Sequence, residues 1–271
     1  MAMTDIETIA AEFVDTAALP APPPEHEFAP SDGAEFIEPP RFSDGDAQNV
    51  VVGSQLTMMT PDISAQLKSA AANTFLFAQL YADRALADAP VEDPMAASLA
   101  WYKKYWKALT RLGWGLVEQG RGERTLDRNA AAVHRELVPV LVGAFTGATA
   151  AVTVVAALRG LAQMEKDQPW ITFYDRKSER ARAHQFQMSQ LAPSGDTQLE
   201  LRLMQMMLDA GITVRQFLFF KQSDVIGTFS YNHVRLQADN RPLLSARVNL
   251  EMRLAPFQKD FIAAAPLPDP V

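Results

Sequence analysis

The chain has 271 residues, 48% of them hydrophobic, and a formal charge of −7, so it has room for one large or two small domains with a core. Cysteine is absent, which excludes a disulfide framework and thiolate metal sites. Eleven Asp or Glu and one Arg give residues 1–50 a charge of −10, which leaves +3 for residues 51–271. This near-neutral remainder argues against a nucleic-acid-binding protein, which needs a broad basic surface.

Residues 1–55 are acidic and contain seven prolines, a composition typical of a disordered arm. Within this arm, four apolar residues recur at helical spacing and are compatible with either an unfolded leader or a short docking helix: Ile6, Ile9, Phe13 and Ala17. We favour the leader. Deleting residues 1–50 is therefore expected to leave thermal stability almost unchanged.

The first residues also bear on localisation. Asp5, Glu7 and Glu12 stand where a signal peptide carries Lys or Arg followed by an apolar core. The sequence therefore predicts no signal peptide, and a protein that is cytoplasmic or is released by a non-classical route.

Two helices are predicted from a capping residue followed by proline. Thr60 with Pro61 predicts a helix that runs to about Leu86, and Asp93 with Pro94 predicts the next helix. The second helix carries an a/d heptad pattern, which indicates lengthwise packing on a partner helix: Met95, Leu99, Tyr102, Trp106, Leu109, Gly113 and Leu116.

A third helical stretch is expected from about Thr125, after a break at residues 120–122. With the uncharged segment that follows, these helices make residues 56–166 a predicted bundle of long helices.

The uncharged segment runs for 21 residues from Val138 to Leu158, long enough to cross a bilayer as a helix. Nine residues are Val, Leu or Phe and favour lipid by about 0.3 to 0.6 kcal/mol each, but one Pro, two Gly and three Thr oppose insertion. The segment therefore suits either a buried bundle helix or a helix that enters a membrane. Gly143 and Gly147 form a G-x-x-x-G pair, which allows close helix packing. The membrane-insertion candidates are Val138, Pro139, Gly143, Phe145, Gly147, Val152 and Leu158.

The apolar period changes from about 3.6 to 2 near Trp170. Leu199, Leu201 and Leu203 alternate with polar residues, and the same alternation runs from Leu244 to Leu254. Further strands are expected at 170–174, 183–191, 214–222 and 225–236, with turns near 193–196 and 238–240. Because no helix is expected between these strands, residues 167–271 are predicted to be antiparallel, as a β-sandwich or a single curled sheet, with a short C-terminal tail.

The sequence holds no recognisable catalytic motif: no nucleophile elbow, phosphate-binding glycine loop, His-Glu-x-x-His signature or complete calcium loop. The four histidines are scattered, and Asp44 and Asp46 around Gly45 make only a fragment of a calcium loop. We therefore predict no enzyme activity, no catalytic residue, no cofactor and no metal site.

A cluster of aromatic and basic residues at 101–111 is typical of a membrane interface, where rings lie at headgroup level and ammonium groups reach phosphates. The alternative is an ordinary bundle helix whose aromatic residues lie in the core while its lysines reach outward. The interfacial anchor candidates are Trp101, Lys103, Lys104, Tyr105, Lys107 and Arg111.

These features together predict an α+β protein with a disordered arm (1–55), a long-helix bundle (56–166) and an antiparallel β-sandwich-like domain (167–271). The layout resembles helical pore-forming toxins, in architecture only. That resemblance implies a soluble, membrane-active protein that inserts its uncharged helix into lipid as a homo-oligomer. The alternative is a non-enzymatic structural or adaptor subunit of a larger assembly, with the N-terminal arm and the heptad helix contacting a protein partner.

Overall fold

A computed structural model describes residues 5–23, 40–126, 143, 169–180, 183–209 and 227–265. The uncharged segment 138–158 lies outside the described residues, apart from Gly143, and so does the strand predicted at 214–222.

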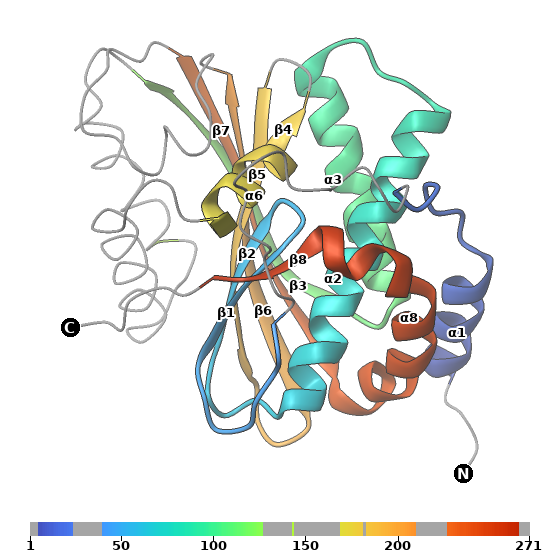
Figure 1. Ribbon diagram of the computed structural model, residues 1–271. Coiled ribbons are helices and arrows are strands. Elements are labelled where there is room, and N and C mark those ends of the chain that lie inside the picture. Colours follow the sequence, from blue (N-terminus) through green and yellow to red (C-terminus); the bar gives the residue numbers. More distant parts are fainter. Residues whose placement is uncertain are drawn as a thin grey trace.

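The described strands form one eight-stranded sheet in the order β3-β7-β6-β5-β2-β1-β8, with β4 paired to β5 (Figure 1). Their bounds are β1 Gln48–Val52, β2 Gln55–Met59, β3 Gly115–Leu126, β4 Glu179–Arg180, β5 Ala183–Pro193, β6 Gln198–Asp209, β7 Gly227–Asp239 and β8 Ile262–Ala264. The described neighbours are antiparallel except β2 and β5, which run parallel. A mixed α+β fold is confirmed, but a β-sandwich is not, because the described strands belong to one sheet.

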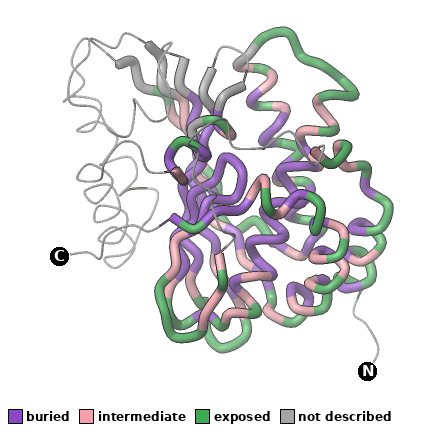
Figure 2. The backbone as a smooth tube through the Cα atoms, in the orientation of Figure 1, coloured by how far each residue is buried: buried purple, intermediate pink, exposed green. Residues whose placement is uncertain are grey.

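Four helices lie together on one side of this sheet (Figure 1): α1 Asp5–Thr16, α2 Ala65–Asp88, α3 Pro94–Arg111 and α8 Asn240–Phe261. The short helix α6 (Pro169–Ser178) contacts β5 and β8. This helical layer includes α1 and α8, which lie near the two ends of the chain, so a long-helix bundle built from residues 56–166 is not confirmed. One core cluster includes Phe13, Leu76 and Leu250, one from each predicted segment, and Figure 2 shows buried stretches running through both layers.

Strand β6 shows how the sequence pattern positions the sheet. Leu199, Leu201 and Leu203 are buried in the core beneath the helices, and the alternating side chains Glu200 and Arg202 point to the opposite face. The strand predicted here is confirmed, as are those that correspond to β5 and most of β7.

Helix α8 occupies the segment Leu244–Leu254 that the alternating pattern predicted as a strand, so that prediction is wrong. The buried residues of this helix are spaced by three or four positions, as one face of a helix requires: Leu243, Ala246, Leu250, Leu254 and Phe257. The apolar residues of the alternating run fall on two opposite sides of the helix, because positions two apart are about 200° apart: Ala246, Leu250 and Leu254 are buried, whereas Val248 and Met252 are exposed.

Helix α6 likewise replaces the strand predicted at 170–174. Trp170, Ile171, Phe173 and Tyr174 are buried, and positions one, three and four residues apart share one side of a helix turn. In so short an apolar run, composition alone does not separate the two structures.

Helix α3 ends at Arg111, before the last two positions of its heptad pattern. Gly113 follows with a φ of 97°, a left-handed conformation that glycine adopts without steric cost and that terminates helices. Strand β3 then continues through Thr125, where a helix was predicted. Gly120, predicted as a break, instead lies within this strand. A Cβ at this position would overlap the His233 imidazole on β7, so a residue without a side chain fits here.

The helix starts were predicted with mixed success. Asp93 caps α3, and its carboxylate accepts a hydrogen bond from the Ala96 amide (2.7 Å), as expected. Ser64, not Thr60, caps α2. The Thr60 amide instead donates to the Leu191 carbonyl (3.1 Å), so the backbone at Thr60 still belongs to the edge of β2.

Helix α1 corrects the prediction of disorder in the N-terminal arm, which is wrong for residues 5–16 and for β1. Phe13 and Val14 are buried, and the Arg253 guanidinium donates to the carbonyls of Val14 and Ala17 at the end of the helix. Glu7 is 3% exposed and pairs with Arg241 (2.9 Å), which fixes the start of α1 on α8. This helix is a packed part of the fold.

Candidate functional site

The outward side of α3 carries a continuous group of cations. Lys103, Lys104, Lys107 and Arg111, which we call the basic face, are exposed, and α3 contains no acidic residue. Spacings of one, four and eight residues from Lys103 place them within one broad side of the helix. The structure therefore brings together the four cations that the sequence predicted as part of an interfacial anchor.

The aromatic part of the predicted anchor lies elsewhere. Trp101 and Tyr105 have no exposed area, and their rings stack with centroids 5.2 Å apart. The Trp101 indole donates to Asp83 on α2 (2.6 Å), and the Tyr105 hydroxyl donates to Gln55 on β2 (2.6 Å). Burial raises the pKa of Tyr105 well above its ordinary value of 10.0, so the phenol remains a donor. In this structure α3 thus presents cations to solvent and aromatic rings to the core.

The sheet beneath α3 carries a row of buried glutamines. Gln55, Gln187 and Gln205 lie opposite one another on β2, β5 and β6, and we call them the amide row. Strand alternation places Gln187 and Gln205 on the same side as Leu191 and Leu203, which face the helices. Gln55 is fully bonded, because its amide donates to Thr57 and Ser189 and its carbonyl accepts from Tyr105.

The other two amides of the row have no hydrogen-bond partner. Both side-chain polar atoms of Gln187 and Gln205 are buried and unpaired, as are those of Gln185 on the same side of β5. Each unpaired buried group costs about 1–3 kcal/mol. The side chains of Gln187 and Gln205 have no exposed area, so no water-sized space adjoins them. The contact between α3 and the sheet is therefore energetically poor at this point.

The residue pattern of β5 contains one sign of this row. Gln185, Gln187 and Ser189 alternate with Phe186 and Met188, which reads as a half-exposed strand. Both sides of β5 are in fact buried here, and the polar side is covered by α3.

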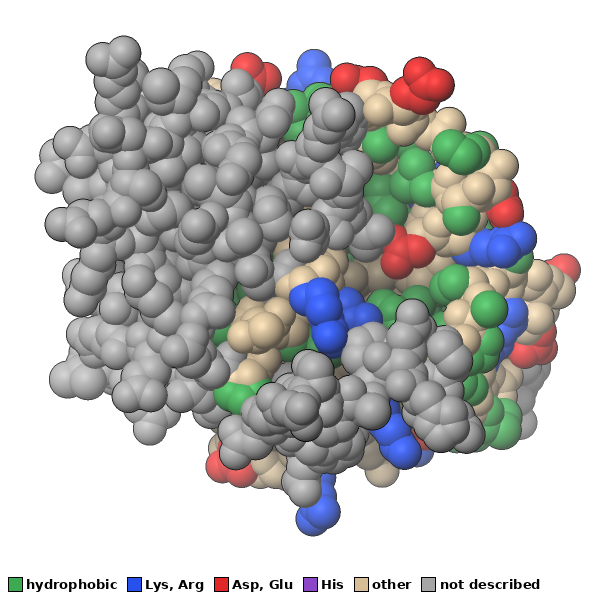
Figure 3. Space-filling view, turned by 45° about the horizontal axis from the view of Figure 1, so that its top comes forward, with side chains coloured by type: hydrophobic (Ala, Val, Ile, Leu, Met, Phe, Trp, Pro, Cys, Tyr) green, Lys and Arg blue, Asp and Glu red, His purple; other side chains and the backbone are tan. Residues whose placement is uncertain are grey.

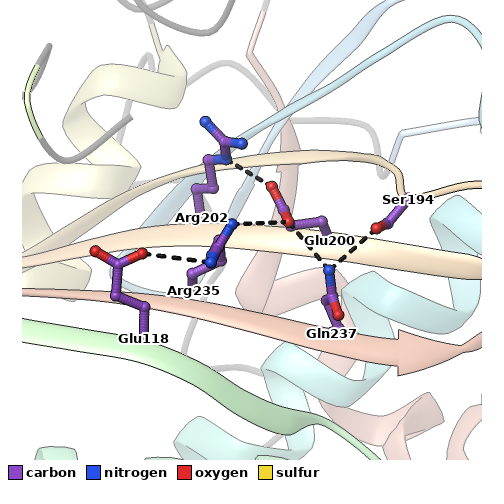
Figure 4. A network of polar contacts seen from close by, with 6 residues as sticks. All are labelled: Glu118, Ser194, Glu200, Arg202, Arg235 and Gln237. Atoms are coloured by element: carbon purple, nitrogen blue, oxygen red, sulfur yellow. Dashed lines mark hydrogen bonds and ion pairs between the residues drawn. The ribbon is translucent and has the colours of Figure 1, made fainter. Parts of the chain in front are cut away.

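A second polar group lies on the opposite face of the sheet (Figure 4). The Glu200 carboxylate contacts Arg202 (2.7 Å), Arg235 (3.9 Å) and Gln237 (3.2 Å), and Arg235 also approaches Glu118 (3.5 Å). Two Arg and two Glu balance one another, and partly exposed pairs of this kind contribute little to stability. This network orders the surface of neighbouring strands and holds no excess charge for a ligand.

The predicted fragment of a calcium loop binds an ammonium group instead. Lys68 has no exposed area, and its Nζ donates to the carbonyls of Ser43 (2.7 Å) and Asp46 (2.6 Å). The Asp44 carboxylate accepts from the Ala65 amide at the start of α2 (2.6 Å). Burial lowers the pKa of Lys68 below its ordinary value of 10.5, and the nearby Asp46 and Asp44 carboxylates partly oppose this effect.

Replacing Lys68 by methionine leaves the two carbonyls without their donor, and we expect the free energy of unfolding to fall by about 1–3 kcal/mol. Because the folded-state pKa is lowered, the unfolded wild type binds more protons between that pKa and 10.5. Stability of the wild type relative to Lys68→Met should therefore rise with pH across this window and level off above it. Urea denaturation of both proteins between about pH 8 and pH 11 checks this, and a pH-independent difference would contradict it.

The remaining predicted site residues are not placed. The membrane-insertion candidates lie outside the described residues except Gly143, an exposed residue in helical backbone. Among the helices that the structure describes, none is both long and apolar enough to cross a membrane. Within the described ranges, no group of three His, Asp or Glu side chains is arranged to hold a metal ion. On the face drawn in Figure 3, the described basic and acidic side chains are interspersed.

No protein-family model and no curated protein matches the chain. Several solved structures align with it at low similarity, and they include the following three. A delta-endotoxin has a TM-score of 0.40 and 13% identity, with 81% of this chain and 91% of that chain covered. The activated Cyt2Ba monomer from Bacillus thuringiensis subsp. israelensis has a TM-score of 0.39 and 13% identity, with 69% and 97% covered. The Evf virulence factor has a TM-score of 0.31 and 8% identity, with 83% and 86% covered. These scores assign the chain to no family.

Proposed function

We propose that this protein is a non-enzymatic, membrane-active protein that binds anionic lipid through the basic face of α3 and inserts residues 138–158 as an oligomer. The observation that carries the binding step is the group of four exposed cations on a helix without an acidic residue. The insertion step is proposed from the sequence alone, because residues 138–158 are 21 consecutive residues without a charge.

The free energy of the binding step can be estimated from the number of cations in the basic face. Each Lys or Arg near an anionic surface contributes about 1 kcal/mol, so four cations contribute about 4 kcal/mol. The chain as a whole carries −7, so attraction must come from the local field of α3 rather than from net charge. Binding should weaken as salt increases, since the Debye length falls to about 8 Å at physiological ionic strength.

Reversing one charge of the basic face should weaken vesicle binding strongly. Lys103→Glu changes an attraction of about 1 kcal/mol into a similar repulsion, so affinity for vesicles containing phosphatidylglycerol should fall about 30-fold. Cosedimentation with these vesicles, and with neutral phosphatidylcholine vesicles, measures the change.

The matched control is Lys259→Glu, an equal charge reversal at an exposed position on α8. This variant should bind anionic vesicles nearly as well as the wild type. Equal losses in the two variants would mean that binding follows net charge, and the basic face would then have no special role.

The second candidate function is an adaptor subunit of a protein assembly. Val248 and Met252 lie one turn apart on α8 and are 52% and 67% exposed, an apolar surface that suits a protein contact. If the wild type binds neither kind of vesicle, this function replaces the membrane one.

A further inference from the structure

The side of α3 that faces the sheet has the chemistry of a membrane interface, although it is covered. It presents Trp101, Tyr102 and Tyr105, all 3% exposed or less. Amphipathic rings of this kind are enriched where lipid headgroups meet hydrocarbon. The Tyr102 hydroxyl is bonded to the Met206 carbonyl (3.1 Å) and the Tyr105 hydroxyl to Gln55, so both polar ends are held by the sheet.

The contact between this side of α3 and the sheet leaves polar atoms of the sheet without hydrogen-bond partners. Gln187, Gln205 and Gln185 bring six amide atoms without partners to the sheet beneath the helices. Separation of α3 would hydrate these atoms, and this gain offsets part of the cost of losing the aromatic contacts.

An exposed segment precedes α3, and a glycine in a left-handed conformation follows it. Residues 89–93 before the helix are exposed, and Gly113 after it has a positive φ. Leu109 belongs to the core, as do Trp101 and Tyr105, so the part of α3 up to Tyr105 can swing outward only when the bonds of its aromatic side chains to α2 and the sheet break.

We propose that the aromatic side of α3 is a concealed binding surface for the interface of an anionic membrane. When the basic face meets anionic lipid, the part of α3 up to Tyr105 separates from the sheet along the amide row and turns Trp101, Tyr102 and Tyr105 into the headgroup layer. This proposal rests on the proposed function, because lipid binding by the basic face is what drives the separation.

A single cysteine reports this opening without ambiguity, because the natural chain has none. Ser98→Cys places a thiol on α3 at a buried position, one turn before Tyr102. Ala72→Cys is the matched control, fully buried on α2. On phosphatidylglycerol vesicles, the thiol of Ser98→Cys should react with a water-soluble maleimide at least about tenfold faster than in solution, whereas Ala72→Cys should react at the same rate in both.

The amide row is tested in the Ser98→Cys background with Gln187→Leu and Gln205→Leu together. Leucine fills a similar volume without unpaired polar atoms, so the double change should raise the melting temperature and abolish the acceleration on vesicles. Vesicle binding should be unchanged, because the basic face is intact.

The outcomes separate the two proposals. Vesicle binding by Ser98→Cys without faster labelling overturns the concealed surface and leaves the proposed function standing. Equal acceleration of labelling in Ala72→Cys would indicate general unfolding and would also overturn the concealed surface. A lower melting temperature in the variant with Gln187→Leu and Gln205→Leu would show that the amides are paired, and this too would overturn it. Absence of binding to vesicles of either composition overturns the proposed function, and the concealed surface with it.

Discussion

Phe13→Ala is expected to lower the free energy of unfolding by about 3–5 kcal/mol, the range for removing a buried phenylalanine. Phe13 is 5% exposed and meets Phe77 and Tyr81 edge to face, with centroids 5.6 and 5.2 Å apart. The Arg111 guanidinium lies 5.0 Å from the same ring and would lose its aromatic partner. Urea denaturation of the full-length chain, followed by circular dichroism, measures the change.

Ile9→Ala is the control within the same helix. Ile9 is 52% exposed, so truncation should change stability by less than about 0.5 kcal/mol. If Phe13→Ala is as mild as Ile9→Ala, α1 does not contribute to the stability of the fold and the leader predicted from composition is correct. By the same argument, deleting residues 1–50 should destabilise the protein rather than leave its melting temperature unchanged.

The N-terminal helix shows how far composition and spacing lead. The spacing of Ile6, Ile9, Phe13 and Ala17 was compatible with a helix, but the unfolded leader that we favoured is wrong for residues 5–16. The buried side of the helix is also shifted, because it includes Glu7 while Ile6 and Ile9 remain exposed. What fixes that side is Arg241, which lies 234 residues away and pairs with Glu7. A contact between distant segments leaves no local trace in a sequence.

Local signals predicted local features well. Asp93 followed by Pro94 marked the start of α3 because capping depends on a few adjacent residues, and the alternation in β6 marked its two faces. The same alternation failed in α8, because this helix carries the apolar residues Val248 and Met252 on its exposed side as well as those on its buried side. Tertiary packing on α1 and α2 decides between the two periods.

For the candidate site too, the sequence predicted the features that follow from local geometry and missed those that depend on tertiary packing. The helical spacing of Lys103, Lys107 and Arg111 follows from local geometry, and these residues share one exposed side of α3. The burial of Trp101 and Tyr105 depends on α2 and on the sheet, and the amide row depends on the pairing of β2, β5 and β6, which the sequence does not display.

Val152→Asp is expected to abolish dye release from anionic vesicles if the proposed function is correct. Val152 lies near the middle of the uncharged segment, outside the described residues. A carboxylate at the centre of a spanning helix costs about 2.5–3.5 kcal/mol on insertion scales, and each 1.4 kcal/mol is tenfold in an equilibrium. The apolar gain and the polar cost of the wild-type segment nearly cancel, so a further loss of about a hundredfold leaves little inserted protein. Leakage of a trapped dye from phosphatidylglycerol vesicles measures the effect.

Loss of dye release alone does not separate failed insertion from a destabilised fold, so a second variant is needed. Leu109→Ala removes a fully buried side chain of α3 at an expected cost of about 2–5 kcal/mol and adds no charge. Both variants are compared with the wild type at a temperature where circular dichroism shows all three folded. Release lost in Val152→Asp and kept in Leu109→Ala supports insertion of the uncharged segment, because only the first variant changes its transfer into lipid. Equal loss in both would attribute the effect to stability. If the wild type itself releases no dye between about pH 5 and pH 8 from anionic or neutral vesicles, insertion is wrong and the exposed apolar side of α8 becomes the surface to test with protein partners.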